Sequence, residues 1–191
     1  MLDLEPAARQ VASVARGVRD DQLDNPTPCT EIAVAGLIDH LLGLSIAFRD
    51  AAKKVGDTAP PQVAAPRDLD PDWRTSLPER LDELVRAWQD PAAWEGMTEA
   101  GGVALPADVA AQVAIDELVM HGWDLARATG QDFACDRATT QVVFEFTKAS
   151  AAPEEAAGRE GVFGPVVAVP EDAPLFERAL GYAGRNPAWT P

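Results

Sequence analysis

Apolar residues recur at spacings of three and four along most of the chain, which is the period of an amphipathic α-helix. The first apolar stripe lies within residues 3–20 and comprises Leu4, Ala8, Val11, Val14 or Ala15, and Val18. Comparable stripes predict a second helix from Thr30–Val34 to about Val55. They also predict helices over residues 73–89, 106–129 and 137–149, and a short helix over 174–183.

Proline and glycine positions predict where these helices begin and end. Pro106 suits the first turn of the fourth helix, and Gly130 suits its end. Pro78 indicates that the third helix begins later than residue 73, because proline lacks the N–H that a helix interior needs. The remaining breaks are Asp24–Pro28, a stop at Gly56, a loop over 57–71, and a turn or short extended connection around Gly96, Gly101 and Gly102.

These elements predict an all-α fold, because no strand pattern is sustained and four long amphipathic helices are joined by loops. A chain of 191 residues suits one domain. We expect residues 1–152 to form a four-helix bundle and residues 153–191, which are rich in Pro and Gly, to form a short irregular extension packed on it.

The net charge of the chain limits the classes of binding partner that can be expected. The net charge is −15, with 31 acidic against 16 basic residues, so nucleic acid and anionic membranes are not expected to bind. The amino-terminal residues do not form a signal peptide, and no apolar run approaches the roughly 20 residues of a membrane helix. We therefore expect a cytoplasmic protein in which Cys29 and Cys135 are free thiols.

The chain has two histidines, His40 and His121, and both fall in the middle of predicted apolar helices. Glu117 precedes His121 by four residues, which places both side chains on one face of a helix. With His40 as the third ligand, these residues predict a site for one divalent metal ion. The alternative is a Glu–His hydrogen bond on a helix surface, because this spacing alone is a weak motif.

Two imidazoles and one carboxylate suit zinc and leave a fourth coordination position open. Nickel, cobalt, manganese or iron would also accept this set. Asp124, three residues after His121, could hold the ring of that histidine or line the open position, and Arg127 is a weaker candidate for orienting a substrate. Alternatively, Asp124 forms a salt bridge with Arg127 or Arg16.

Three segments resemble DinB-like proteins, and more narrowly the metal-binding domain of mycothiol-dependent maleylpyruvate isomerase and its short, single-domain actinobacterial relatives. The first segment joins Thr27-Pro28-Cys29-Thr30 to the helix that ends Leu37-Ile38-Asp39-His40-Leu41. The second is the run from Asp116 to Gly130, and the third is the tail from Phe163 to Pro174.

The resemblance implies a DinB/YfiT-like antiparallel four-helix bundle in which His40, Glu117 and His121 hold a zinc-like ion. It also implies that the open position takes the thiol of mycothiol. The characterised isomerase has a further carboxy-terminal domain with a basic active-site residue, for which residues 153–191 are too short. We therefore expect a metal-dependent thiol transferase or isomerase-like enzyme acting on a small thiol or a small electrophile. The alternative is a non-catalytic metal-binding, sensor or interaction protein. A homodimer and a monomer are both compatible with the sequence.

Overall fold

The computed structural model describes residues 1–30, 32–56, 69–155, 159 and 162–191, so most of the loop predicted over 57–71 lies outside the described residues. The fold is mostly helical, which confirms the predicted all-α class. Its α-helices are α1 (Glu5–Gly17), α2 (Val34–Ala52), α3 (Trp73–Trp88), α4 (Ala107–Thr129), α5 (Arg137–Ser150) and α7 (Leu175–Tyr182). The 3-10 helices are η1 (Asp20–Gln22), η3 (Pro91–Trp94) and η4 (Pro153–Glu155).

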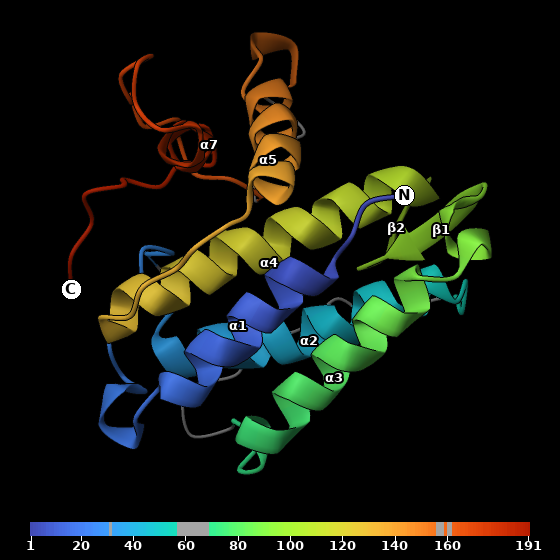
Figure 1. Cartoon of the computed structure of the whole chain (residues 1–191), viewed down its shortest axis with the longest axis horizontal. Helices are drawn as coiled ribbons and strands as arrows, with labels where there is room; N and C mark the ends of the chain where they lie inside the picture. Colours follow the sequence, from blue (N-terminus) through green and yellow to red (C-terminus); the bar gives the residue numbers. More distant parts are fainter. Residues whose placement is uncertain (31, 57–68, 156–158, 160–161) are drawn as a thin grey trace.

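Helices α1 to α4 form a bundle in which each helix packs against two others. Both α1 and α2 contact α3 on one side and α4 on the other. Figure 1 shows that α1 and α4 run in one direction along the bundle, and α2 and α3 in the opposite direction. The packed pairs α2–α4 and α1–α3 are therefore antiparallel, and the packed pairs α2–α3 and α1–α4 are parallel.

The predicted apolar stripes form the core of this bundle. Burial of such side chains is the main favourable term in folding, at roughly 25 cal/mol per Å² of apolar surface. The stripe of α2 is buried along its whole length. The fully or almost fully buried side chains include Val11, Val14, Leu37, Ile38, Leu41, Leu77, Leu81, Leu84, Ile115, Leu118 and Leu125.

The start of α3 differs from the prediction based on Pro78. The helix begins at Trp73 and contains Pro78 in its interior. Contacts on both sides stabilise its first turn: Trp73 is buried, and the guanidinium of Arg74 donates to the Val18 carbonyl and to Asp20. The first turn therefore forms despite the N–H that proline removes.

The predicted extended connection between α3 and α4 is a short antiparallel hairpin of β1 (Met97–Ala100) and β2 (Val103–Pro106). Gly101 and Gly102 at its turn have φ values of +59° and +79°, which residues with a side chain rarely adopt. The hydroxyl of Thr98 donates to the Ala51 carbonyl at 2.6 Å and thereby joins the hairpin to the end of α2.

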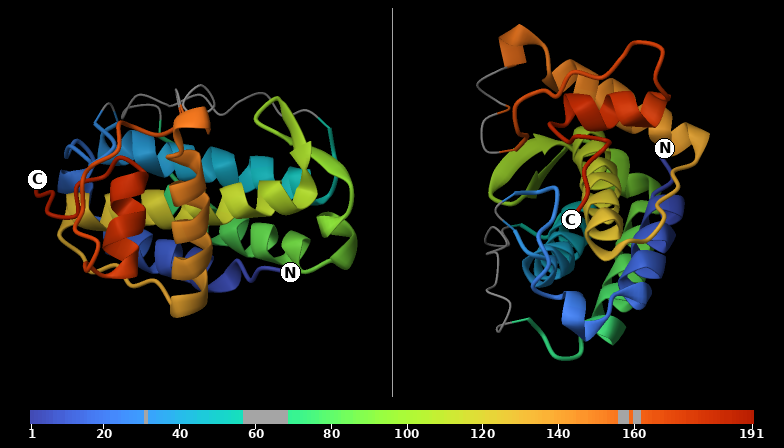
Figure 2. Two further views of the ribbon diagram at one scale, coloured as in Figure 1. Left: turned by 90° about the horizontal axis from the view of Figure 1, so that it is seen from above. Right: turned by 90° about the vertical axis from the view of Figure 1, so that its left-hand side faces the viewer.

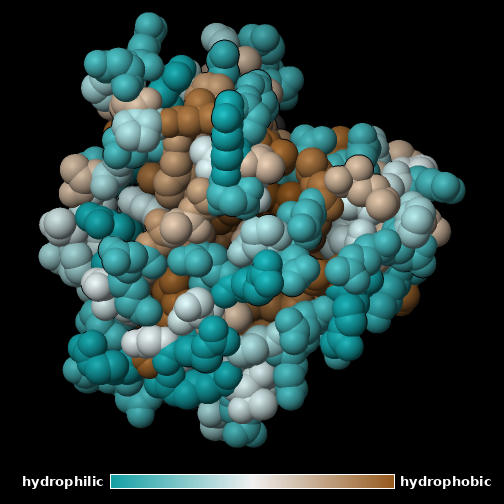
Figure 3. All heavy atoms as spheres, viewed as in Figure 1, coloured by the Kyte–Doolittle hydropathy of each residue, from teal (hydrophilic) through white to brown (hydrophobic). Residues whose placement is uncertain are grey.

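Helices α5 and α7 form a second layer that lies across α4, as both views in Figure 2 show. The face shown in Figure 3 is mostly hydrophilic at its rim, and apolar side chains show in its middle, between the second layer and the bundle and between the bundle helices. Among the described residues, no helix combines the length and apolar character needed to cross a bilayer.

Candidate metal centre

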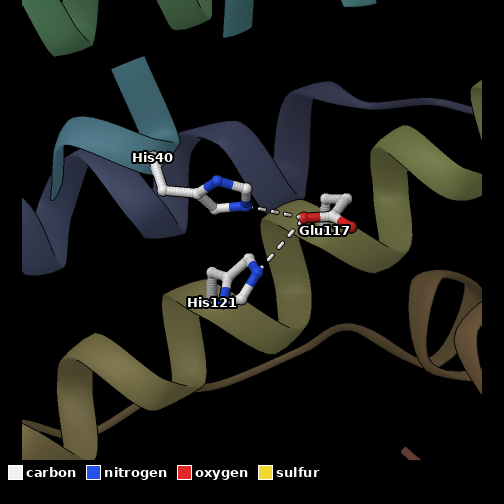
Figure 4. A group of neighbouring side chains, drawn as sticks. All are labelled: His40, Glu117 and His121. Carbon is white, nitrogen blue, oxygen red and sulfur yellow. Dashed lines mark hydrogen bonds and ion pairs between the residues drawn. The ribbon is translucent and has the colours of Figure 1, made fainter. Parts of the chain in front are cut away.

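Two antiparallel helices supply the three side chains of the predicted site. His40 lies on α2 among buried leucines, and Glu117 and His121 lie one turn apart on α4. Because the apolar stripes of α2 and α4 pack together, the polar side chains at the edge of that interface are brought face to face. Figure 4 shows the three side chains pointing toward one another.

The donor atoms converge on one carboxylate oxygen. Nε2 of His40 and Nε2 of His121 each lie 3.2 Å from Oε2 of Glu117. One ligand atom from each residue lies within 4.8 Å of the other two. The two imidazole rings meet edge to face, with centroids 4.7 Å apart. The structure therefore brings together all three residues that the sequence analysis selected.

The charges in this cluster favour an ionised Glu117 carboxylate beside a protonated His121 in the metal-free protein. Burial raises the pKa of Glu117, but hydrogen bonds from His121 and His40 outweigh it and leave this pKa well below its usual value. Burial lowers the pKa of His121, but hydrogen bonds to Asp124 and Glu117 raise it to about 9. Both pKa shifts arise because groups of opposite charge are in contact in a buried environment.

Asp124 holds the other nitrogen of the His121 ring. Its Oδ2 lies 3.2 Å from Nδ1 of His121, and its side chain is fully buried. The guanidinium of Arg185 donates to the same Oδ2 at 3.0 Å and is itself 8% exposed. With Nδ1 occupied in this way, Nε2 of His121 is the nitrogen that faces Glu117.

Arg185 is a residue that the sequence analysis missed, because it lies beyond the short helix at residues 175–182 and belongs to no periodic pattern. Arg185 takes the place of Arg127 and Arg16, which the sequence offered as partners of Asp124. Arg127 instead donates through Nε to the carbonyl of Trp189 at 3.2 Å and does not join the cluster. Both arginines attach the carboxy-terminal segment to α4.

Asp116, next to Glu117 on α4, is a second residue that the sequence analysis passed over. Its side chain is 3% exposed, and its Oδ1 has no hydrogen-bond partner among the described residues. Burial raises the pKa of Asp116 well above its usual value, and the neighbouring charge of Glu117 adds to this effect. A buried carboxyl group with an unpaired oxygen is unusual in a folded protein, which makes Asp116 a notable neighbour of the cluster.

A cavity of about 400 Å³ opens beside the three clustered residues. His40, Asp116 and Glu117 form part of its wall, and the rest is mostly apolar. Further wall residues come from α2, the hairpin, α4 and α5, and from four residues after α5: Leu44, Phe48, Val103, Leu105, Val109, Val113, Phe146, Glu155, Arg159, Val162 and Phe163. The cluster therefore borders a space that can hold a small molecule.

Sequence comparisons find relatives of this chain. The chain is 33% identical over 136 residues to two uncharacterized proteins of Mycobacterium tuberculosis, one from strain CDC 1551 / Oshkosh and one from strain ATCC 25618 / H37Rv. Each match covers 65% of this chain and 64% of the relative, so the chain spans less than two thirds of the length of these relatives. No solved structure gives a significant match.

A family model described as the mycothiol maleylpyruvate isomerase N-terminal domain matches residues 4–126. The matched range runs from the residue before α1 to the last turn of α4 and includes His40, Glu117 and His121. It covers the four-helix bundle except the last three residues of α4, and α5 and α7 lie beyond it. The chain belongs to the family of the mycothiol maleylpyruvate isomerase N-terminal domain.

Proposed function

We propose that His40, Glu117 and His121 bind one divalent metal ion, with zinc as the first candidate. We further propose that the protein is a metal-dependent thiol transferase or isomerase-like enzyme that uses mycothiol as its thiol. The observation that carries this proposal is the convergence of two imidazole nitrogens on one carboxylate oxygen, at the edge of a cavity.

The donor set fits such an ion in type, and two of the three spacings between donor atoms fit as well. Bonds of about 2.0–2.2 Å in a tetrahedral zinc site place neighbouring ligand atoms roughly 3.4 Å apart. The two distances of 3.2 Å between the histidine nitrogens and Oε2 of Glu117 are close to that separation. The contact from Asp124 to Nδ1 of His121 is the support that a ligating histidine commonly receives.

An open coordination position follows from the number of ligands. In the described part of the chain, the cluster has three members, whereas structural zinc sites have four protein ligands. A metal ion held here would lower the pKa of a bound thiol and so supply a thiolate at neutral pH. The side chains of the protein orient the ligands, and the apolar cavity limits access of water to the reacting groups.

Metal content tests the first part of the proposal. We expect the purified wild-type protein to contain close to one metal ion per chain and His121→Ala to contain little. Glu145→Ala is the matched control, because Glu145 is an exposed carboxylate on α5 that contacts only Gln141 among the described side chains. Equal metal content in the wild type and His121→Ala would reject the metal site.

Cobalt substitution tests the thiol. Cobalt(II) bound at the cluster should develop a thiolate charge-transfer band when mycothiol is added. S-methyl mycothiol is the control, because its sulfur cannot form a thiolate. An unchanged spectrum at saturating mycothiol would reject mycothiol as the cosubstrate while leaving the metal site in place.

A further inference from the structure

We infer that the carboxy-terminal segment, residues 183–191, is coupled to the metal site, with Arg185 as a positioning residue that acts on His121 through Asp124. The attached segment orients His121 for metal binding, and a bound ion in turn holds the segment on α4. This inference rests on the proposed metal site. It adds a residue that lies beyond the matched family range and does not line the cavity.

One row of side chains along α4 carries both metal ligands and the contacts of the carboxy-terminal segment. Glu117, His121, Asp124 and Arg127 follow one another at spacings of four, three and three residues. Such spacings make each side chain a neighbour of the next on the helix surface. The metal-binding part and the anchoring part of the row meet where Nδ1 of His121 lies 3.2 Å from Oδ2 of Asp124.

Arg185 anchors the segment in the interior of the protein. Its Nη2 donates to Oδ2 of Asp124 at 3.0 Å, and its Nε lies 3.5 Å from Oδ1 of the same carboxylate. These two contacts fix both the position and the plane of the carboxylate. Arg185 is 8% exposed and Asp124 is fully buried, so neither charged group has water as a substitute partner. A displacement of Arg185 would therefore also displace the oxygen that orients the His121 ring.

Beyond Arg185, the segment lies on the surface. Residues 186–191 are exposed or half-buried. Arg127 of α4 donates through its Nε to the Trp189 carbonyl at 3.2 Å. Local opening requires least free energy where the backbone is exposed and few apolar contacts are lost. The segment can therefore detach from α4 while the bundle stays folded, and Arg185 then leaves Asp124.

The coupling acts in both directions. A metal ion at the cluster needs Nε2 of His121 aimed at Glu117, and the contact of Nδ1 with Asp124 holds the ring in that orientation. If the attached segment raises the affinity for zinc by some factor, zinc must strengthen the attachment by the same factor. Both effects can be measured separately on the intact chain.

The zinc affinity of Arg185 variants tests the first effect. We expect Arg185→Gln to lower the affinity about tenfold, as measured by competition with a chromophoric chelator, because it removes the support of Asp124. Arg185→Lys should retain more of the affinity, because its ammonium can still pair with Asp124. Arg137→Gln is the matched control and should bind zinc as the wild type does, because Arg137 is exposed at the start of α5.

The absorption spectrum of bound cobalt(II) separates positioning from a purely structural role. The spectrum should change in Arg185→Gln, because a reoriented His121 ring alters the geometry around the ion. A purely structural role of Arg185 would lower the free energy of unfolding but leave the zinc affinity and the cobalt spectrum of the folded protein unchanged.

Hydrogen exchange of the wild type tests the second effect without any substitution. The backbone N–H groups of Arg185 and Trp189 donate to the carbonyls of Leu180 and Asn186 at 2.8 and 2.9 Å, so their exchange reports opening of the segment. Zinc should slow exchange in the peptide that covers residues 183–191, by about the factor that separates the zinc affinities of the wild type and Arg185→Gln. In Arg185→Gln, zinc should leave this exchange unchanged.

Equal zinc affinity in Arg185→Gln and the wild type would overturn the inference and leave the metal site in place. Exchange of residues 183–191 that zinc does not slow in the wild type would also overturn it, even if Arg185→Gln fails to fold. A wild-type protein that binds no zinc would reject the proposed function and the coupling together.

Discussion

At the scale of single residues, successive side-chain contacts connect the candidate metal site on α4 to the carboxy-terminal segment. Glu117 contacts His121, His121 contacts Asp124, and Asp124 contacts Arg185. Because Asp124 and Arg185 are both buried, neither charge has water as an alternative partner. The pair therefore fixes the ring of His121 from behind, on the side away from Glu117.

Asp124→Asn should weaken metal binding without abolishing it. The variant keeps the shape of the side chain but removes the negative charge that supports Nδ1 of His121. Loss of such a supporting partner typically reduces metal affinity 10- to 100-fold. Competition with a chromophoric chelator measures the metal affinity. Asp132→Asn serves as the control, because Asp132 is an exposed aspartate that follows the end of α4. Equal affinities in the two variants would contradict a supporting role.

The metal-free protein should lose stability as the pH rises. The pKa of His121 is raised from 6.5 to about 9, chiefly through Asp124 and Glu117 acting against burial. The folded state therefore binds this proton more tightly than the unfolded state, and the resulting stability is complete below pH 6.5 and lost as the pH rises through 9. At about 1.4 kcal/mol per pKa unit, its size is on the order of 3 kcal/mol.

Urea unfolding of protein treated with a chelator, between pH 6.5 and 9.5, measures this contribution. The free energy of unfolding should fall more steeply with pH in the wild type than in His121→Gln, which cannot bind the proton. Parallel curves for the two proteins would show that His121 is not stabilised as a cation.

At the scale of elements, apolar periodicity predicted the helices because each has at least two turns and one buried face. It could not predict the hairpin, because strands of four residues contain too few alternations to form a pattern. The spacing of Glu117 and His121 placed them on one face of α4. The approach of His40 depends on the packing of α2 against α4, which no local pattern contains. His40 was selected because it is the other of the two histidines in the sequence, and the family resemblance agreed with that choice.

Gly184→Ala should loosen the segment that carries Arg185. Gly184 has a φ of +79°, and an added Cβ would lie 2.7 Å from the carbonyl oxygen of Gly164. The strain and the contact together should lower the free energy of unfolding by about 1–3 kcal/mol. Gly56→Ala is the control, because a Cβ there meets nothing within 4 Å. Equal free energies of unfolding for the two variants, measured in urea, would show that the backbone around Gly164 and Gly184 accommodates the added Cβ without loss of stability.

At the scale of the whole molecule, the bundle and the second layer contribute different parts of the site. The matched family range supplies the three clustered residues, whereas Phe146, Arg159 and Arg185 all lie beyond it. Sequence reasoning found the first group and missed the arginines of the second. A single arginine in an irregular segment acquires its partner only from tertiary folding, so no periodic signal marks it.

A substitution in the core of the bundle should lower the stability of the protein without changing its zinc binding. Leu81 of α3 is 1% exposed and remote from the cluster, so Leu81→Ala should lower the free energy of unfolding by about 2–5 kcal/mol. Ligands that bind only the folded state stabilise it by mass action. Zinc should therefore raise the Tm of the wild type and of Leu81→Ala by similar amounts and leave that of His121→Ala unchanged. A zinc-induced shift in His121→Ala would assign the stabilising ion to another site.

The most direct test is a crystal structure of the zinc-loaded protein with anomalous diffraction recorded on both sides of the zinc absorption edge. We expect one strong anomalous peak within bonding distance of Nε2 of His40, Nε2 of His121 and a carboxylate oxygen of Glu117, with a non-protein ligand in the remaining position. A peak elsewhere, or none between α2 and α4, would contradict the assignment of these three residues as a metal site.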